Sequence, residues 1–212
     1  MPSQSAVTAV ILAGGRGRRM GGCNKALLTL GGETIIQRQL REVSAITDDI
    51  IVVANDADFA ERLSGAGVAR VVPDRFAGAG PLAGAHAGFA AAAHPRIWLL
   101  GCDQPYASAA AVSLLLQRMD KARALAAIPR IAGKLQPLHA VYRREAGAVA
   151  ETLLRTGERK MLIWLERLDR IDVEESELIT FGLTPSFAND IDTPEQYERA
   201  IASWTATKGD RD

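Results

Sequence analysis

Short apolar runs alternate with longer stretches of helical pattern along the first half of the chain. The apolar runs are rich in Val, Ile and Leu and predict strands over residues 8–12, 49–54, 69–72 and 96–100. The stretches between and after them predict helices over residues 34–45, 56–64, 81–93 and 108–120. Because the predicted strands are almost continuously apolar, they are typical of a parallel sheet that helices cover on both faces.

The second half of the chain is less regular. We expect strands over residues 124–128, 135–142 and 170–173, and helices over residues 145–156 and 160–167. A last helix is expected to run through Trp204, with Thr193 as its N-cap and Pro194 in its first turn. Residues 205–212 are polar and are expected to form a flexible tail. Since no linker or repeat divides the chain, the pattern predicts one α/β domain over residues 1–212, with a mostly parallel, doubly wound sheet of Rossmann-like type.

The charge and cysteine content narrow the possible function classes. The chain carries 25 Lys and Arg against 25 Asp and Glu, a balance that argues against nucleic acid or an anionic membrane as the main partner. Two cysteines, Cys23 and Cys102, are too few for a disulfide framework or a zinc site. The first residues lack the pattern of a leader peptide, and no apolar segment is long enough to span a bilayer. The sequence therefore predicts a cytoplasmic protein without a membrane partner.

A glycine-rich, basic loop follows the first predicted strand. Residues 14–22 contain five glycines, and three arginines and Lys25 lie in the same segment. Glycines let backbone N–H groups approach a ligand closely, so the loop could surround a triphosphate with donors and positive charge. Two familiar phosphate motifs do not match, because Cys23 stands where a Walker A motif needs lysine and Met20 where a dinucleotide fingerprint needs glycine. The functional interpretation is a phosphate site of another kind, and the alternative is a solvated loop.

Polar residues also follow three other predicted strands. Asp103 comes after the strand over residues 96–100, so its carboxylate is expected at the same edge of the sheet as the glycine loop. A carboxylate there suits Mg²⁺, which prefers oxygen ligands and bridges to phosphates, although Asp103 could instead cap the following helix. Asn55 and Asp74 follow the second and third strands, where they could contact a ligand or form turns, since Pro73-Asp74 is itself a turn signal.

The segment from Leu12 to Lys25 resembles a family signature. It fits the pattern L-A-G-G-x-x-x-R-M-G-G-x-x-K of the molybdenum cofactor guanylyltransferases, which belong to a wider superfamily of nucleotidyltransferases. Further segments that resemble the family follow in order and cover most of the chain: Val53-Ala54-Asn55, Val72-Pro73-Asp74, Gly80-Pro81-Leu82-Ala83-Gly84, Gly101-Cys102-Asp103-Gln104-Pro105 and Asp190-Ile191-Asp192-Thr193-Pro194-Glu195. The glycine loop and the Cys-Asp-x-Pro element are signals of the superfamily, whereas Gly-Pro-Leu-Ala-Gly is more specific. The resemblance implies a single-domain nucleotidyltransferase fold.

The resemblance also implies roles for individual residues. It implies that Asp103 binds Mg²⁺ and that Arg19 and Lys25 offset charge on the triphosphate, so these three form the expected catalytic set. The residues that it places at the nucleotide are Leu12, Ala13, Gly14, Gly15, Lys25, Asn55, Asp74, Gly80, Pro81, Leu82 and Asp103.

The C-terminal element departs from the family pattern. Asp190 and Asp192 stand where the family commonly has two asparagines, and an ionised aspartate cannot donate the hydrogen bonds of an amide. Asp190 could complete the metal site, whereas Asp192 could contact the acceptor or only precede the last helix. Asn189 could supply the missing amide. Arg159 and Lys160 lie near a family segment that faces the acceptor, and a pairing with a neighbouring glutamate at the surface is the alternative.

Taken together, the resemblance implies transfer of GMP from GTP to molybdenum-loaded molybdopterin, with release of pyrophosphate and with Mg²⁺ as the cofactor. An Asp-x-Asp-Thr-Pro element also occurs in cytidylyl-transferring relatives, so a molybdopterin cytidylyltransferase or a transferase for another phosphorylated acceptor stays open. A GTP-binding protein that delivers the cofactor without catalysis is a further alternative. The expected partners are GTP and molybdopterin, together with a molybdoenzyme chaperone or other cofactor-synthesis proteins, and neither nucleic acid nor a membrane.

Overall fold

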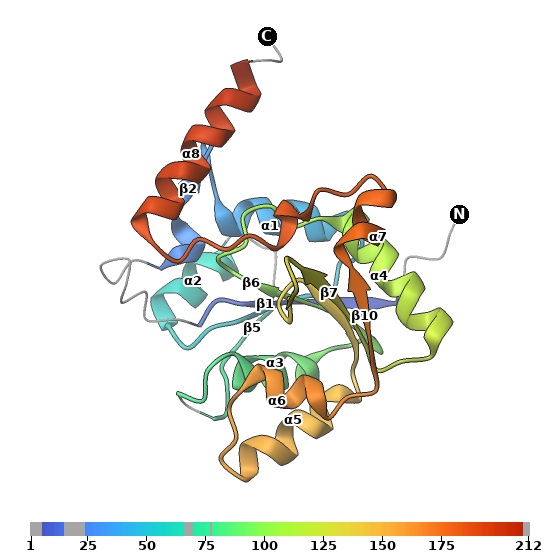
Figure 1. Cartoon of the computed structure of the whole chain (residues 1–212). Helices are drawn as coiled ribbons and strands as arrows, with labels where there is room; N and C mark the ends of the chain where they lie inside the picture. The colour runs from blue at the N-terminus through green and yellow to red at the C-terminus, as the bar shows by residue number, and fades with distance from the viewer. Residues whose placement is uncertain (1–5, 15–23, 66–69, 77, 210–212) are drawn as a thin grey trace.

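A central sheet organises the computed structural model, which describes residues 6–14, 24–65, 70–76 and 78–209 (Figure 1). Its strands are β1 (Val7–Leu12), β4 (Ile50–Val53), β5 (Arg70–Val72), β6 (Arg96–Gly101), β7 (Ala126–Ile131), β8 (Lys134–Leu135), β9 (Ala140–Arg143) and β10 (Arg170–Glu174). They lie in the order β10-β7-β9-β6-β1-β4-β5, and β8 pairs with β7 beside this path. β9 runs antiparallel to β6 and β7, whereas β1 is parallel to β4 and β6, β4 to β5, and β7 to β10. The predicted mostly parallel sheet is confirmed.

Helices cover both faces of this sheet, as the alternation of patterns predicts (Figure 1). One face carries α1 (Ile35–Ser44), α2 (Ala57–Gly65), α4 (Ala109–Ala122) and α7 (Glu175–Thr180), and the other carries α3 (Pro81–Ala91), α5 (Ala146–Arg155) and α6 (Met161–Glu166). Side chains of β1 alternate between the two cores: Val7, Ala9 and Ile11 point to the first, and Val10 and Leu12 to the second. Burial of β1 on both faces explains why its sequence is continuously apolar.

The register of the central strands brings three chain segments to one place. Leu12, the last residue of β1, pairs with Val53 of β4 and with Gly101 of β6. Because these strands are parallel, the loops that follow them leave the sheet at the same edge, which is where ligands bind in open α/β sheets. The glycine loop, Asn55 and Asp103 all belong to these loops.

A helix and a hairpin outside the two main layers form a third, small core. The hairpin consists of β2 (Thr29–Leu30) and β3 (Glu33–Thr34), and the helix is α8 (Pro194–Gly209). Leu30 and Ile35 pack there with Ile191 and Ala200. The Trp204 ring lies over the hairpin turn. The guanidinium of Arg38 stacks on this ring, 3.9 Å from its centroid. The start of α8 is therefore held against the first third of the chain.

The structure differs from the predicted elements in several places. The expected strand over residues 135–142 is divided into β8 and β9, because Pro137 has no N–H to donate and His139 has a φ of 69°. The β2–β3 hairpin, α7 and the short 3₁₀ helix η3 (Pro185–Ala188) were not expected. β7 begins and ends later than the predicted strand over residues 124–128, and α8 continues beyond Trp204 to Gly209. These differences lie mainly where short elements give little periodic signal.

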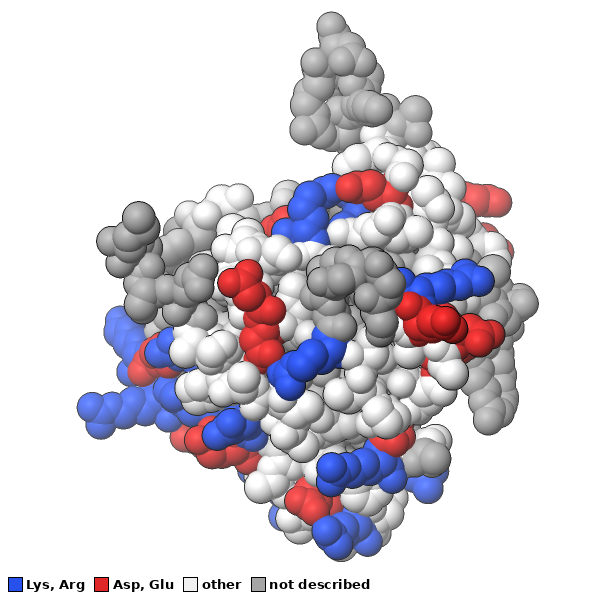
Figure 2. Space-filling view, turned by 180° about the vertical axis from the view of Figure 1, so that it is seen from behind, with Lys and Arg blue, Asp and Glu red and all other residues white. Residues whose placement is uncertain are grey.

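The surface agrees with the balanced charge of the sequence. Figure 2 shows Lys and Arg side chains interspersed with Asp and Glu on the face of the molecule turned away from the viewer of Figure 1. Among the described residues, no helix combines the length and the apolar character that crossing a membrane requires.

Candidate active site

The edge of the sheet at the end of β1 contains a small cavity. The N–H of Ala13 donates to the carbonyl of Val53 (2.9 Å) and the N–H of Cys102 donates to the carbonyl of Leu12 (3.0 Å), so the three strand ends are tied together. The cavity has a volume of about 130 Å³. It is lined by Leu12, Ala13, Gly14, Asn24, Lys25, Pro81, Gly101, Cys102, Asp103 and Leu138. Of the residues that the sequence analysis expected at a nucleotide, this cavity brings together Leu12, Ala13, Gly14, Lys25, Pro81 and Asp103, whereas Asn55, Asp74, Gly80 and Leu82 do not line it.

Lys25 lies between two carboxylates at this cavity. Its Nζ atom is 3.2 Å from Oδ2 of Asp103 and forms a second ion pair with Oδ1 of Asp192. The side chain of Lys25 is 17% exposed and that of Asp103 is 24% exposed. Burial lowers the pKa of Lys25, but the hydrogen bonds and charges of Asp192 and Asp103 outweigh burial and raise the pKa overall. Lys25 therefore carries a positive charge at neutral pH.

Local structure holds Lys25 in place. It begins the short 3₁₀ helix η2 (Lys25–Leu27), which Asn24 caps by accepting a hydrogen bond from the N–H of Ala26 at 3.1 Å. Ala26 is fully buried in the core formed by α1 and α4. The lysine side chain is thus attached to an ordered segment of backbone that packs against the body of the protein.

A four-residue turn presents the carboxylate of Asp103. The turn runs from Gly101 to Gln104 and is closed by a hydrogen bond from the N–H of Gln104 to the carbonyl of Gly101 at 3.3 Å. A Cβ at Gly101 would lie 2.6 Å from Oδ1 of Asp103, so glycine leaves the room that the carboxylate needs. The carbonyl of Asp103 accepts the N–H of Ile191 at 2.9 Å, which attaches the segment before α8 to this turn. That attachment accounts for the approach of Asp192 to Lys25.

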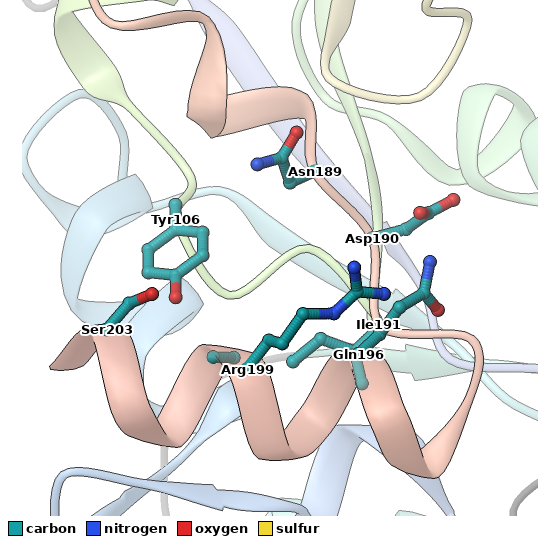
Figure 3. A pocket seen from close by; sticks show the side chains of 8 residues that line it. Tyr106, Asn189, Asp190, Ile191, Gln196, Arg199 and Ser203 are labelled. Carbon is teal, nitrogen blue, oxygen red and sulfur yellow. The ribbon is translucent and has the colours of Figure 1, made fainter.

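A second cavity lies against α8 and has a volume of about 320 Å³ (Figure 3). It is lined by Tyr106, Asn189, Asp190, Ile191, Gln196, Arg199, Ala200 and Ser203. Burial raises the pKa of Asp190, and the negative charges of Asp192 and Asp103 raise it further. The two aspartates of the Asp-x-Asp element therefore have different surroundings: Asp192 pairs with Lys25, whereas Asp190 lines the second cavity.

Asn55 and Asp74 are hydrogen-bonded to each other beyond the ends of β4 and β5. The amide of Asn55 donates to Oδ2 of Asp74 at 2.8 Å, and its oxygen accepts the N–H of Asp74 at 3.0 Å. Oδ1 of Asp74 is buried and has no hydrogen-bond partner within the described part of the chain. A buried carboxylate oxygen without a partner is an acceptor that a ligand could use.

The Gly-Pro-Leu-Ala-Gly segment opens α3 as predicted. Gly80 is the N-cap with a φ of 73°, a conformation that favours glycine, and Pro81 occupies the first turn. Leu82 is fully buried, and a Cβ at Gly88 would lie 2.2 Å from Cγ1 of Val10. Glycine within α3 therefore lets the helix lie close to β1, and Pro81 reaches the cavity.

Four other residues that the sequence analysis singled out lie either outside the described residues or away from the two cavities. Arg19 and Gly15 lie outside the described residues. Arg159 and Lys160 are exposed, and their backbone N–H groups donate to Oε1 of Glu158 at 2.8 and 2.9 Å. Their side chains do not line either of the two cavities.

The oxygen ligands at the cavity fit a divalent cation only in part. Within the described ranges, no group of three or more His, Cys, Asp or Glu side chains is arranged to hold a metal ion. Asp103 and Asp192 nevertheless approach the same ammonium group. Mg²⁺ keeps several water ligands and needs only one or two carboxylates when substrate phosphates complete its shell. The residues present therefore fit Mg²⁺ bound together with a nucleotide and not a site formed by the protein alone.

Two residues near the site were missed in the sequence. Gln39 is fully buried in α1, where it contacts the Asp103 turn, and Tyr106 lines the second cavity. A signal for Gln39 was present, because it is a polar residue on the apolar stripe formed by Ile35, Ile36 and Val43. For Tyr106, an aromatic residue shortly after the Asp103 turn, we find no such signal in the sequence.

The sheet brings an ammonium group and a carboxylate together beside the end of its first strand, and comparison with known proteins identifies the chain as a nucleotidyltransferase. Residues 9–171 match the MobA-like NTP transferase domain. The chain belongs to this family.

Individual relatives agree with this assignment over nearly the whole chain. A probable molybdenum cofactor guanylyltransferase of Natronomonas pharaonis is 34% identical and covers 91% of this chain and 96% of its own length. A probable molybdenum cofactor guanylyltransferase of Opitutus terrae is 36% identical, with coverage of 98% and 94%. The crystal structure of molybdopterin-guanine dinucleotide biosynthesis protein A from Archaeoglobus fulgidus superposes with a TM-score of 0.82 at 28% identity, covering 94% of this chain and 99% of that one.

Proposed function

We propose that this enzyme transfers GMP from GTP to molybdopterin and releases pyrophosphate. The names of the relatives support a role in molybdenum cofactor biosynthesis. The observation that carries the proposal is the position of Lys25, whose ammonium lies beside the carboxylate of Asp103 at the cavity next to β1. A cation and a carboxylate at that position suit a nucleoside triphosphate that binds together with Mg²⁺.

The nucleotide is proposed to bind along the ends of β1, β4 and β5. Leu12, Ala13 and Gly14 line the cavity. Beyond the end of β5, Oδ1 of Asp74, which has no partner among the described residues, supplies a hydrogen-bond acceptor. Guanine has an amino group that can donate to such an acceptor. Gly80 and Pro81 place the first turn of α3 at the same edge, where the positive end of the helix dipole favours negative charge.

The proposed reaction is a direct displacement at phosphorus. An oxygen of the terminal phosphate of molybdopterin attacks the α-phosphorus of GTP, the bond from that phosphorus to the α–β bridging oxygen breaks, and pyrophosphate leaves with this oxygen. A phosphate oxygen is already ionised at neutral pH, so the chain needs no general base. Lys25 offsets the negative charge that moves onto the leaving group, and we propose the same role for Arg19. Asp103 would hold Mg²⁺ that binds with GTP, and the ion would supply positive charge to the phosphate oxygens.

The acceptor is proposed to bind on the side of α8. Asn189 supplies an amide and Arg199 a guanidinium to the cavity of about 320 Å³, and both groups suit a phosphorylated ring system. We propose that Asp192, which pairs with Lys25, also contacts the acceptor. Arg159 and Lys160 precede α6, on the other face of the sheet from α1, and we propose them only as secondary contacts of the acceptor.

A nucleotide panel tests this proposal. Pyrophosphate release is measured with GTP, CTP, ATP and UTP, each with and without Mg²⁺ and with and without molybdopterin. We expect release only when GTP, Mg²⁺ and molybdopterin are present together. The Asp-Ile-Asp sequence at 190–192 favours a cytidylyltransferase as the second candidate, which release with CTP and not with GTP would establish. Binding of GTP without any pyrophosphate release would instead support a delivery protein.

A further inference from the structure

A buried glutamine of α1 binds both ends of the turn that carries Asp103. Gln39 has no exposed surface, and its Nε2 atom donates to the carbonyl of Gly101 at 2.7 Å and to the carbonyl of Gln104 at 2.9 Å. Gly101 is the first and Gln104 the last residue of the turn. One amide therefore fixes the two positions between which the Asp103 carboxylate projects.

The environment of Gln39 argues against a role in stability alone. Two carbonyl oxygens can face only a donor, so Nε2 must point to the turn and Oε1 away from it. Oε1 is buried and lacks a hydrogen-bond partner among the residues that the structure describes, which costs free energy. An apolar side chain would fit the surrounding stripe, which includes Ile36 and Val43, without that cost. What glutamine adds over an apolar side chain is therefore the pair of hydrogen bonds that it donates to the turn.

The turn has further attachments that make its position matter. Gln104 is 4% exposed, its Oε1 accepts the N–H of Gly101 at 3.0 Å, and its Nε2 donates to the carbonyl of Leu138 at 3.3 Å. The Asp103 carbonyl binds the N–H of Ile191 at 2.9 Å. A shift of the turn would therefore move the Asp103 carboxylate and the chain segment before α8 together.

We propose that Gln39 is a positioning residue for nucleotidyl transfer, because its amide holds the Gly101–Gln104 turn so that the Asp103 carboxylate faces the cavity beside Lys25. Gln39 does not line the cavity and acts through Asp103. The inference rests on the proposed function, in which Asp103 holds the divalent cation.

The first test measures the turn itself. Gln39→Met removes both donated hydrogen bonds and keeps a side chain of similar length. Thr47→Val is the matched control, because Thr47 is also buried and donates to a backbone carbonyl, that of Val7 at 2.6 Å, at the opposite end of β1. By hydrogen exchange, we expect the amides of Gln104 and Ile191 to exchange about tenfold faster in Gln39→Met and unchanged in Thr47→Val. Equal exchange in wild type and Gln39→Met would overturn the proposal.

The second test measures the site. Mn²⁺ is titrated calorimetrically into the protein saturated with GTP, and its dissociation constant is expected to rise about tenfold in Gln39→Met. Gln39→Glu, which can donate one hydrogen bond when protonated, should fall between wild type and Gln39→Met. An unchanged Mn²⁺ affinity, or an equal loss in Thr47→Val, would contradict the positioning role. If wild type with GTP binds no Mn²⁺, the proposed function fails, and the exchange rates still decide whether Gln39 holds the turn.

Discussion

Lys25 and Asp192 are 167 positions apart in the sequence, and they form an ion pair at the end of β1. Asp192 reaches the lysine because the neighbouring Ile191 is hydrogen-bonded to the Asp103 carbonyl and buried in the third core with Leu30. The pair gives Lys25 a second counter-ion besides Asp103. A nucleoside triphosphate that binds Lys25 would compete with both carboxylates for its positive charge.

Asp192→Asn is expected to tighten GTP binding when no divalent cation is present. The triphosphate then no longer competes with the Asp192 carboxylate for Lys25. Ion pairs close to the protein surface are worth up to ~1 kcal/mol, so the affinity for GTP should rise about twofold to fivefold. Isothermal titration calorimetry in EDTA measures it. Asp120→Asn serves as the control, since Asp120 pairs with Arg143 and Arg96 instead. Weaker binding in Asp192→Asn would refute competition for Lys25.

Asp103→Asn is expected to separate binding from turnover. The amide keeps the shape of the carboxylate and the main-chain bond to Ile191, so the fold should change little. Metal-free GTP affinity should rise, as in Asp192→Asn, because Lys25 loses a carboxylate counter-ion. Pyrophosphate release should fall by about a hundredfold or more, because a neutral amide is a much poorer ligand for Mg²⁺. Steady-state kinetics and a thermal melt check both statements. Turnover near the wild-type rate would remove Asp103 from the proposed catalytic set.

Two glycine substitutions should have different consequences. A Cβ at Gly101 would lie 2.6 Å from Oδ1 of Asp103, the end of a side chain, whereas one at Gly88 would lie 2.2 Å from Val10 in the core. Gly101→Ala should therefore reduce pyrophosphate release strongly with a small loss of stability. Gly88→Ala should lower the free energy of unfolding by about 1–3 kcal/mol through overpacking, with a smaller effect on kcat of the folded fraction.

Denaturant unfolding gives the stability of both glycine variants, and initial rates of pyrophosphate release give their kcat. Equal losses of stability with equal losses of kcat in the two variants would mean that Gly101 serves packing in the same way as Gly88.

His139 is expected to make stability depend on pH. It is fully buried, its Nε2 accepts the N–H of Ser108 at 2.9 Å, and burial lowers its pKa from 6.5 to about 3. Between these values the unfolded chain binds a proton that the folded protein does not, so the free energy of unfolding decreases as the pH falls from 6.5 toward 3. His139→Asn, which tolerates the φ of 69°, should flatten this dependence by up to about 1.4 kcal/mol per pH unit.

Urea unfolding between pH 4 and pH 7, in steps of about half a pH unit, measures how the free energy of unfolding of wild type and of His139→Asn depends on pH. His94→Gln is the control, because His94 is only partly buried and lies before the start of β6. The same slope in wild type and His139→Asn would show that other groups cause the pH dependence.

Much of the fold was predictable because its signals are local. The almost continuously apolar runs identified β1, β4 and β6, and the helices expected over residues 34–45 and 108–120 agree closely with α1 and α4. The β2–β3 hairpin was missed although Gly31 and Gly32, both with positive φ, are a turn signal between its two-residue strands. The division of the strand expected over residues 135–142 depended on the backbone conformation of His139, which its burial between Trp98 and Phe187 imposes.

The candidate site was likewise predictable only where its signals are local. Local composition alone indicated a phosphate loop that ends at Lys25, a carboxylate at Asp103 and a glycine-proline start of α3, because each needs only a short segment with a particular backbone or charge. Long-range packing settled which of two nearby aspartates meets Lys25, and it brought the amide of Gln39 to the Asp103 turn. Such pairings depend on which buried surfaces come together when the sheet, α1 and α8 assemble, and no periodicity or motif records that choice.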